Sequence, residues 1–288
     1  MDLRDKVPWW GKIALKVILS RLNISYKTWQ KLRIFRHGLM DDPAYAYNTF
    51  KRHYDSAGFL NKGNKFTMLE LGPGDSLASG IIASYHGAAK SLLVDKSDDA
   101  IQNETNYEDL LQYLNSELKM NETARTGESI DKIMARWNIE YLTDGLESLK
   151  SIRDNSIDYL WSQSVLEHIR KSEFSSYIRE FRRIIKNEGI SVHGVDLKDH
   201  LSYAHNNLRF SEKTWESDFM AKSGFYTNRI LFTEMMAIIK ENGFGITVKN
   251  IKKWDKIPTQ RDKLDRMYRN LPEDELKISD FDLILKPV

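Results

Sequence analysis

The clearest pattern in the sequence is an alternation of short apolar runs and helical repeats between residues 66 and 285. The apolar runs predict seven strands, over 66–71, 91–95, 138–142, 157–161, 190–195, 244–251 and 280–285. Apolar residues spaced by three or four positions predict helices between them, over 76–86, 174–185 and 230–242. Strands that alternate with helices form a mostly parallel α/β sheet covered on both faces. No strong helix separates the last two strands, so we expect an antiparallel edge pair there.

Two further helical regions flank this pattern or interrupt it. Residues 98–137 are too long for a simple connection, and their spaced apolar residues predict a helical insertion that can shape a substrate site. Residues 11–22 also follow a helical pattern. The predicted organisation is therefore a helical N-terminal region, 1–59, followed by one α/β domain, 60–288.

Composition excludes several classes of protein. The 288 residues include no cysteine, so a disulfide scaffold, a thiolate metal site and a cysteine nucleophile are excluded. No apolar stretch approaches the roughly 20 residues of a spanning helix, and the start lacks the pattern of a signal peptide. A soluble cytoplasmic protein is the expectation.

The net charge of +2 is unevenly distributed. Residues 1–40 carry nine Lys or Arg against two Asp, a net of +7, which leaves −5 for the remaining 248 residues. One interpretation is a basic helix packed on the main domain. The alternative is peripheral contact with the inner face of a membrane through residues 1–40, with Trp9-Trp10 as the interfacial anchor.

The first predicted strand ends in a turn suited to a nucleoside cofactor. Glu70 precedes Gly72-Pro-Gly74-Asp75, and glycine allows both a sharp turn and close approach of a ligand to the backbone. Asp95 ends the second strand, where a carboxylate can accept hydrogen bonds from ribose hydroxyls. Leu77 replaces the third glycine of a dinucleotide site. The acidic residues beside the turn favour a cationic cofactor over a pyrophosphate.

These motifs resemble the class I S-adenosylmethionine-dependent methyltransferases. Glu70-Leu-Gly-Pro-Gly is similar to their first motif, and residues 157–168 are similar to the motif on their fourth strand. The resemblance implies a Rossmann-like, seven-stranded, mostly parallel sheet with an antiparallel edge strand, and S-adenosyl-L-methionine as cofactor. It implies cofactor contacts from Glu70, Gly72, Gly74, Asp75, Asp95, Asp144, Gly145, Ser162 and Gln163.

A further resemblance concerns the acceptor of the methyl group. Residues 193–200, 206–210 and 224–229, with Pro8-Trp-Trp near the start, resemble a bacterial methyltransferase subgroup associated with surface-polysaccharide or sugar-nucleotide pathways. It implies methyl transfer to a polar small molecule, glycan or sugar nucleotide, most simply at oxygen. The alternatives are methylation of RNA, favoured only by the basic arm, and a catalytically inactive cofactor-binding or assembly protein. Nucleic acid is not the expected partner, because residues 41–288 are net acidic.

Candidate catalytic residues follow the fourth and fifth strands. A hydroxyl acceptor must lose a proton, and imidazole is the usual base near neutral pH. We therefore expect His168 or His200 to be the base, with Asp196 or Asp199 orienting it or binding substrate. The alternative is that these residues only order their own loops. A metal held by Glu167, His168, Asp196 and His200 is a third possibility, but no metal is predicted, because Ser164 replaces the additional Glu of the metal-dependent enzymes.

Candidate substrate-binding residues lie between residues 206 and 230. Arg209 and Arg229 can each hold a phosphate or carboxylate through two hydrogen bonds, and Asn228 adds an amide beside them. The alternative for the two arginines is surface salt bridging.

Overall fold

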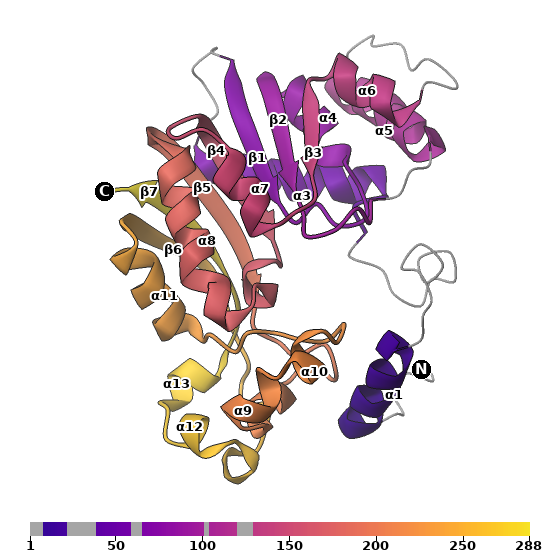
Figure 1. Cartoon of the computed structure of the whole chain (residues 1–288). Helices are drawn as coiled ribbons and strands as arrows, with labels where there is room; N and C mark the ends of the chain where they lie inside the picture. The colour runs from indigo at the N-terminus through magenta and orange to yellow at the C-terminus, as the bar shows by residue number, and fades with distance from the viewer. Residues whose placement is uncertain (1–7, 22–38, 59–64, 101–103, 120–128) are drawn as a thin grey trace.

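The computed structural model describes residues 8–21, 39–58, 65–100, 104–119 and 129–288. Seven strands form one sheet in the order β3-β2-β1-β4-β5-β7-β6 (Figure 1). The strands are β1 (Phe66–Leu71), β2 (Ala88–Val94), β3 (Ile139–Leu142), β4 (Ile157–Gln163), β5 (Ile185–Asp196), β6 (Phe244–Lys253) and β7 (Ile278–Pro287).

The sheet confirms the predicted α/β class and all seven strands. Strands β1 to β5 are parallel, and β7 runs antiparallel to both β5 and β6. The antiparallel strand therefore lies second from the edge, with β6 outside it. The carboxyl ends of β1, β2, β3, β4 and β5 meet along one edge, where ligands bind in open α/β sheets.

Helices cover both faces of the sheet because strand side chains alternate between them. In β4, Tyr159 and Trp161 belong to the apolar cluster on one face of the sheet, whereas Leu160 belongs to the cluster on the other face. The first face carries α3 (Pro43–Ala57), α4 (Ala78–Tyr85), α5 (Glu104–Leu118) and α6 (Ile130–Arg136); the second carries α7 (Leu146–Ser151), α8 (Lys171–Ile184) and α11 (Phe232–Glu241).

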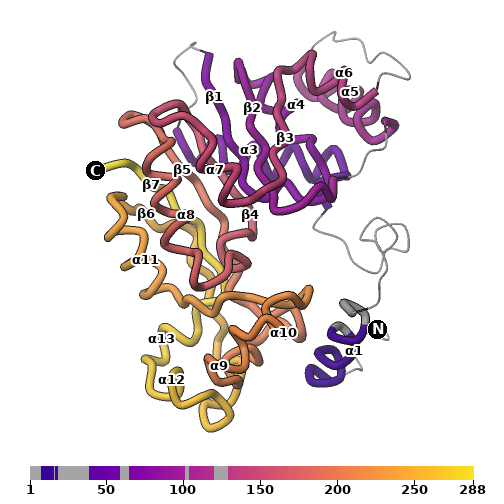
Figure 2. The backbone as a smooth tube through the Cα atoms, viewed as in Figure 1, coloured from indigo at the N-terminus to yellow at the C-terminus, as the bar shows by residue number. Residues whose placement is uncertain are grey.

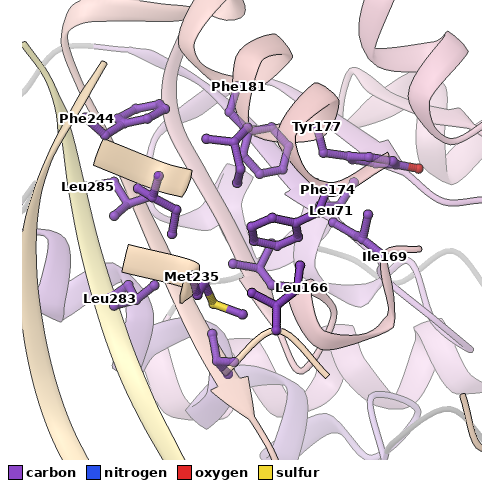
Figure 3. Packing of buried hydrophobic residues seen from close by; sticks show 14 of the residues in the cluster. Leu71, Leu166, Ile169, Phe174, Tyr177, Phe181, Met235, Phe244, Leu283 and Leu285 are labelled. Atoms are coloured by element: carbon purple, nitrogen blue, oxygen red, sulfur yellow. The ribbon is translucent and has the colours of Figure 1, made fainter. Parts of the chain in front are cut away.

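The packing of α8 also fixes the chain after β4. Phe174 and Phe181 lie on the buried side of α8 at the predicted helical spacing (Figure 3). Leu166, the first residue of the short helix η2 (Leu166–His168), and Ile169, which follows this helix, point into the same cluster. Because these two neighbours are anchored in the core, His168 is held outward at the edge of the sheet.

Helix α3 is part of the sheet domain although its residues fall in the expected N-terminal region 1–59. Tyr47, Phe50 and Tyr54 are buried against the first face of the sheet, and Phe50 makes an edge contact with Trp161. The expected boundary at residue 60 therefore does not coincide with a break in packing. Within residues 98–137, α5 and α6 are the helices that the spacing predicted.

A layer of short helices lies beyond the carboxyl edge of the sheet (Figure 2). It contains η3 (Asn206–Arg209), α9 (Glu212–Trp215), α10 (Asp218–Ala221), η4 (Arg261–Lys263), α12 (Arg266–Arg269) and α13 (Glu273–Leu276). Helix α1 (Trp9–Arg21) lies beside α10. Among the described residues, no helix has the length and apolar character needed to cross a membrane.

One buried histidine gives the fold a testable dependence on pH. His193 of β5 lies between the hydroxyls of Ser162 and Ser191, with its ring stacked on Phe181. Burial, with a smaller contribution from His53, lowers the pKa of His193 to about 3. The unfolded chain therefore binds a proton below about pH 6.5 that the folded chain does not, and stability falls as pH decreases toward 3.

We predict that His193→Gln removes this dependence. The free energy of unfolding of the variant is lower than that of the wild type at pH 7. The difference between these two free energies shrinks by about 2 kcal/mol between pH 7 and pH 5. Urea unfolding followed by circular dichroism at both pH values measures the difference. A constant difference would contradict a neutral, buried His193.

Candidate active site

The turn after β1 is built around a glycine with no room for a side chain. Gly72 has a φ of +70°, and a Cβ at this position would lie 2.5 Å from Cγ2 of Val165. Two loops thus meet at the edge, one after β1 and one after β4. The glycine holds them closer than any other residue would allow.

Asp95 ties the next strand end to the same turn. Its carboxylate accepts hydrogen bonds from the backbone N–H groups of Gly74, at 3.1 Å, and Lys96, at 2.6 Å. Its backbone carbonyl accepts from the N–H of Gly145, at 2.8 Å. The expected ribose-binding carboxylate therefore stands where the ends of β1, β2 and β3 converge, and it is only partly buried.

Glu70 and Asp75 place two buried acids beside this turn. The hydroxyl of Ser79 on α4 donates to Glu70, and burial, together with the charge of Asp95, raises the pKa of Glu70 to about 8. A buried carboxyl with a raised pKa is stabilised in its ionised form by a nearby cation. The turn therefore favours a positively charged ligand over a pyrophosphate.

The end of β3 contributes a second glycine under steric restriction. Gly145 has a φ of +52°, and a Cβ there would lie 2.9 Å from the hydroxyl oxygen of Tyr177. Asp144 beside it is exposed, and its N–H donates to Ser148. The carboxylate of Asp144, one of the expected cofactor contacts, is thus accessible at the edge of the sheet.

The two residues predicted after β4 lie on opposite faces of the sheet. The hydroxyl of Ser162 is in the interior, 2.7 Å from Nδ1 of His193. The Oε1 of Gln163 accepts hydrogen bonds from Arg52, at 2.5 Å, and from His53, at 2.8 Å. Burial lowers the pKa of His53 to about 4, so this imidazole is neutral at neutral pH.

Sequence reasoning missed the contribution of α3 to the site. His53 continues the buried spacing of Tyr47, Phe50 and Tyr54, and this pattern was the available signal. Arg52, the residue before His53, is exposed and lies at the rim of the site.

The structure brings the two candidate bases together. The Nε2 atoms of His168 and His200 lie 3.0 Å apart, and the two rings are stacked. The Nδ1 of His168 lies 2.8 Å from the backbone carbonyl of Tyr226, so it must donate a proton there. In its neutral form, His168 therefore presents the lone pair of Nε2, which accepts a hydrogen bond from the Nε2–H of His200.

The candidate acids have other partners than these imidazoles. Asp196 pairs with Lys198, at 2.9 Å. Asp199 is buried and orders its own loop by accepting from the N–H groups of Leu201, Ser202 and Asn206. The Tyr226 carbonyl, rather than an aspartate, thus orients His168.

The arrangement around Glu167 does not favour a metal. Within the described ranges, no group of three or more His, Cys, Asp or Glu side chains is placed to hold a metal ion. Glu167 is fully buried, with its Oε1 accepting from the N–H of Asp196, and burial raises its pKa well above the usual value for Glu.

The predicted substrate-binding residues have structural partners. Asn228 is buried and donates to the carbonyls of Leu166 and Ile169, which fixes the segment that carries His168. Arg229 is also buried, and it bonds Glu212 at 2.6 Å and the Phe210 carbonyl at 2.7 Å. Arg229 therefore forms the salt bridge weighed as its alternative role, although its side chain is buried rather than at the surface. Contact with substrate would require it to give up these bonds.

Arg209 is the half-buried member of the predicted set. It donates to Asn206 at 2.8 Å, and its guanidinium lies 4.9 Å from the ring centre of Trp9. It therefore links η3 to α1.

Comparison with known protein families explains the motifs at the sheet edge. Residues 69–193 match the family described as a methyltransferase domain, and this range contains the end of β1, all of β2, β3 and β4, and most of β5. The expected enzyme class and its cofactor, S-adenosylmethionine, are confirmed, whereas the acceptor is not identified by this match. No curated protein matches the sequence.

Solved methyltransferases are similar to this chain at low sequence identity. One is phosphoethanolamine N-methyltransferase 2 of Haemonchus contortus, with 16% identity, a TM-score of 0.46, and coverage of 84% of this chain and 53% of that one. Another, from Archaeoglobus fulgidus, has 12% identity, a TM-score of 0.48, and coverage of 85% and 94%. The chain thus spans about half the length of the Haemonchus structure.

The residues at the edge of the sheet fit the cofactor of this domain. Gly72 and Gly74, both with positive φ, open the backbone to a ligand, and the carboxylates of Glu70, Asp95 and Asp144 suit one that carries positive charge and ribose hydroxyls. Asp95 would hold the ribose, and Glu70 would balance positive charge.

We predict that Asp95→Ala weakens S-adenosylmethionine binding about 100-fold, because charge-assisted hydrogen bonds to the ribose are lost. Isothermal titration calorimetry measures the change. Asp131→Ala, on the exposed side of α6, serves as the matched control and should bind like the wild type. Unchanged affinity in a folded Asp95→Ala protein would contradict the assigned cofactor site.

Proposed function

We propose that this methyltransferase domain methylates a hydroxyl group of a polar small molecule, with a glycan or sugar nucleotide as the acceptor class. The observation that carries the proposal is the His168–His200 pair, whose Nε2 atoms lie 3.0 Å apart beyond the ends of β4 and β5. A hydroxyl is a weak nucleophile until its proton is removed, so an oriented imidazole beside the acceptor supports oxygen as the methylated atom.

The bonding of His168 supports its assignment as the base. Its Nδ1–H is committed to the Tyr226 carbonyl, which selects the tautomer with a lone pair on Nε2. An acceptor hydroxyl that replaces His200 as the donor to this lone pair would pass its proton to Nε2 of His168. The cofactor, when bound, supplies an electrophilic methyl group, and the protein aligns the acceptor oxygen with it.

A polar cavity at the same edge supports a sugar as the acceptor. The cavity has a volume of about 400 Å³ and lies at the ends of β4 and β5 and the start of β7. Gly194 lines it, and a Cβ there would lie 2.5 Å from Gln163 Oε1, so the glycine leaves Gln163 in place. The network of His53, Arg52 and Gln163 holds one wall rigid.

The charges in the cavity favour a neutral, hydroxyl-rich ligand. Arg52 and Lys252 face three carboxylates, those of Asp196, Asp280 and Asp282. Partial burial acts to raise the pKa of Asp280, but hydrogen bonds from Lys252, Ser279 and Lys198 lower it to about 2. An ionised Asp280 accepts hydrogen bonds from sugar hydroxyls and repels phosphates. The cavity therefore favours the neutral sugar unit of an acceptor over a phosphate, whether that phosphate belongs to RNA or to a sugar nucleotide.

The sequence resemblance to a polysaccharide-associated subgroup points to the same acceptor class. It includes residues 193–200, which contain the end of β5 and His200. This segment thus lines part of the cavity and supplies His200, the partner of the candidate base.

We predict that His168→Gln lowers kcat about 100-fold or more, because the base is lost, while S-adenosylmethionine affinity stays unchanged. The assay follows release of S-adenosylhomocysteine with a panel of sugar nucleotides and glycans, and with RNA as a separate acceptor. His86→Gln is the control, since His86 lies near the opposite edge of the sheet, between α4 and β2.

Three results would contradict the proposal. Methylation of RNA but of no sugar would favour the nucleic-acid alternative. Tight cofactor binding without turnover on any acceptor of the panel would favour an inactive binding protein. Full activity of His168→Gln on a sugar would exclude His168 as the base.

A further inference from the structure

Helix α1 presents apolar residues on two adjacent sides. Its inner side, with Trp9, Ile13 and Val17, packs against an apolar cluster beyond the edge of the sheet. The Trp9 ring makes an edge contact with Phe210, with ring centres 6.2 Å apart. The cluster consists of Leu201, Trp215, Met220, Phe225 and Tyr226. These contacts dock α1 on the protein through one side only.

The outer side of α1 is exposed although it is apolar. Trp10, Leu15 and Ile18 are 63%, 52% and 61% exposed, and Ala14 between them is exposed as well. Residues 10, 14 and 18 share one side of a helix because they are spaced by four. An apolar side of a helix is normally covered by other parts of a folded protein. Among the described residues, this outer side lacks such a cover.

A second exposed aromatic residue lies on a neighbouring helix. Phe219 of α10 is 54% exposed, and α10 is the helix beside α1 (Figure 1). Exposed apolar residues that gather in this way mark sites of association.

The charge of the segment indicates what the outer side meets. Residues 8–21 contain Lys12, Lys16 and Arg21 and no acidic residue, and residues 1–40 carry a net charge of +7. Basic residues next to exposed Trp and Ile suit the headgroup region of a membrane, where anionic lipids attract the charge and the apolar groups enter the interface.

We propose that the outer side of α1 docks this protein on an anionic lipid membrane. The helix is too short to span a bilayer and would lie in its surface. Its inner side would stay on the cluster that contains Tyr226, whose carbonyl holds His168. Docking would therefore place the carboxyl edge of the sheet near the membrane surface. This proposal stands whether or not the acceptor is a sugar.

The test is sedimentation of the full chain with vesicles. We expect binding to vesicles rich in phosphatidylglycerol, weaker binding at high salt, and little binding to pure phosphatidylcholine. Trp10→Ser combined with Ile18→Ser should weaken binding about ten-fold or more, because two apolar side chains no longer enter the interface. Met267→Ser, which changes an exposed apolar residue on α12, is the matched control and should bind like the wild type.

Three outcomes would overturn the proposal. The first is a wild type that remains in the supernatant with both kinds of vesicle, and the second is a double variant that binds as well as the control. The third is a dimer in size-exclusion chromatography that only the double variant dissociates, because a second copy of the chain then covers α1. Thermal unfolding of each variant checks that the fold is retained.

Discussion

The close approach of the loops after β1 and β4 is the constraint on which the site depends. Gly72 faces Val165 so closely that a Cβ would lie 2.5 Å from its Cγ2. The same segment carries Leu166 and Ile169 into the core and leaves His168 outside it. The turn that opens the cofactor edge and the chain that positions the candidate base are therefore one packed unit.

Polar groups that lie away from the surface reinforce this unit. Asn228 bonds the carbonyls of Leu166 and Ile169, and the Tyr226 carbonyl fixes the ring of His168. Each bond satisfies a backbone or imidazole group that would otherwise lack a partner. Tyr226 and Asn228 thus hold in place the segment that carries His168.

The sequence was sufficient to place the strands along the chain and the glycine turn after the first strand, because both follow from local patterns. Apolar runs and a glycine turn are visible in a few consecutive residues, and Asp95 is identified by ending a strand. The partners of Arg229 could not be predicted in this way. Its burial depends on Glu212 and on the rings of Trp215 and Tyr268, which only the folded chain brings together. Similarly, the alternation of side chains along β4 predicts that Ser162 and Gln163 lie on opposite faces of the sheet. Which of the two faces carries Arg52 is determined by the packing of α3, which the alternation does not predict.

The most direct test of the account is a crystal structure of the protein with S-adenosylhomocysteine. The account predicts ribose hydroxyls within hydrogen-bond distance of the Asp95 carboxylate, with the nucleoside against the Gly72–Gly74 turn. It also predicts that the sulfur faces the side of the edge where His168 and the polar cavity lie. A nucleoside bound elsewhere, or a sulfur directed away from His168, would contradict it.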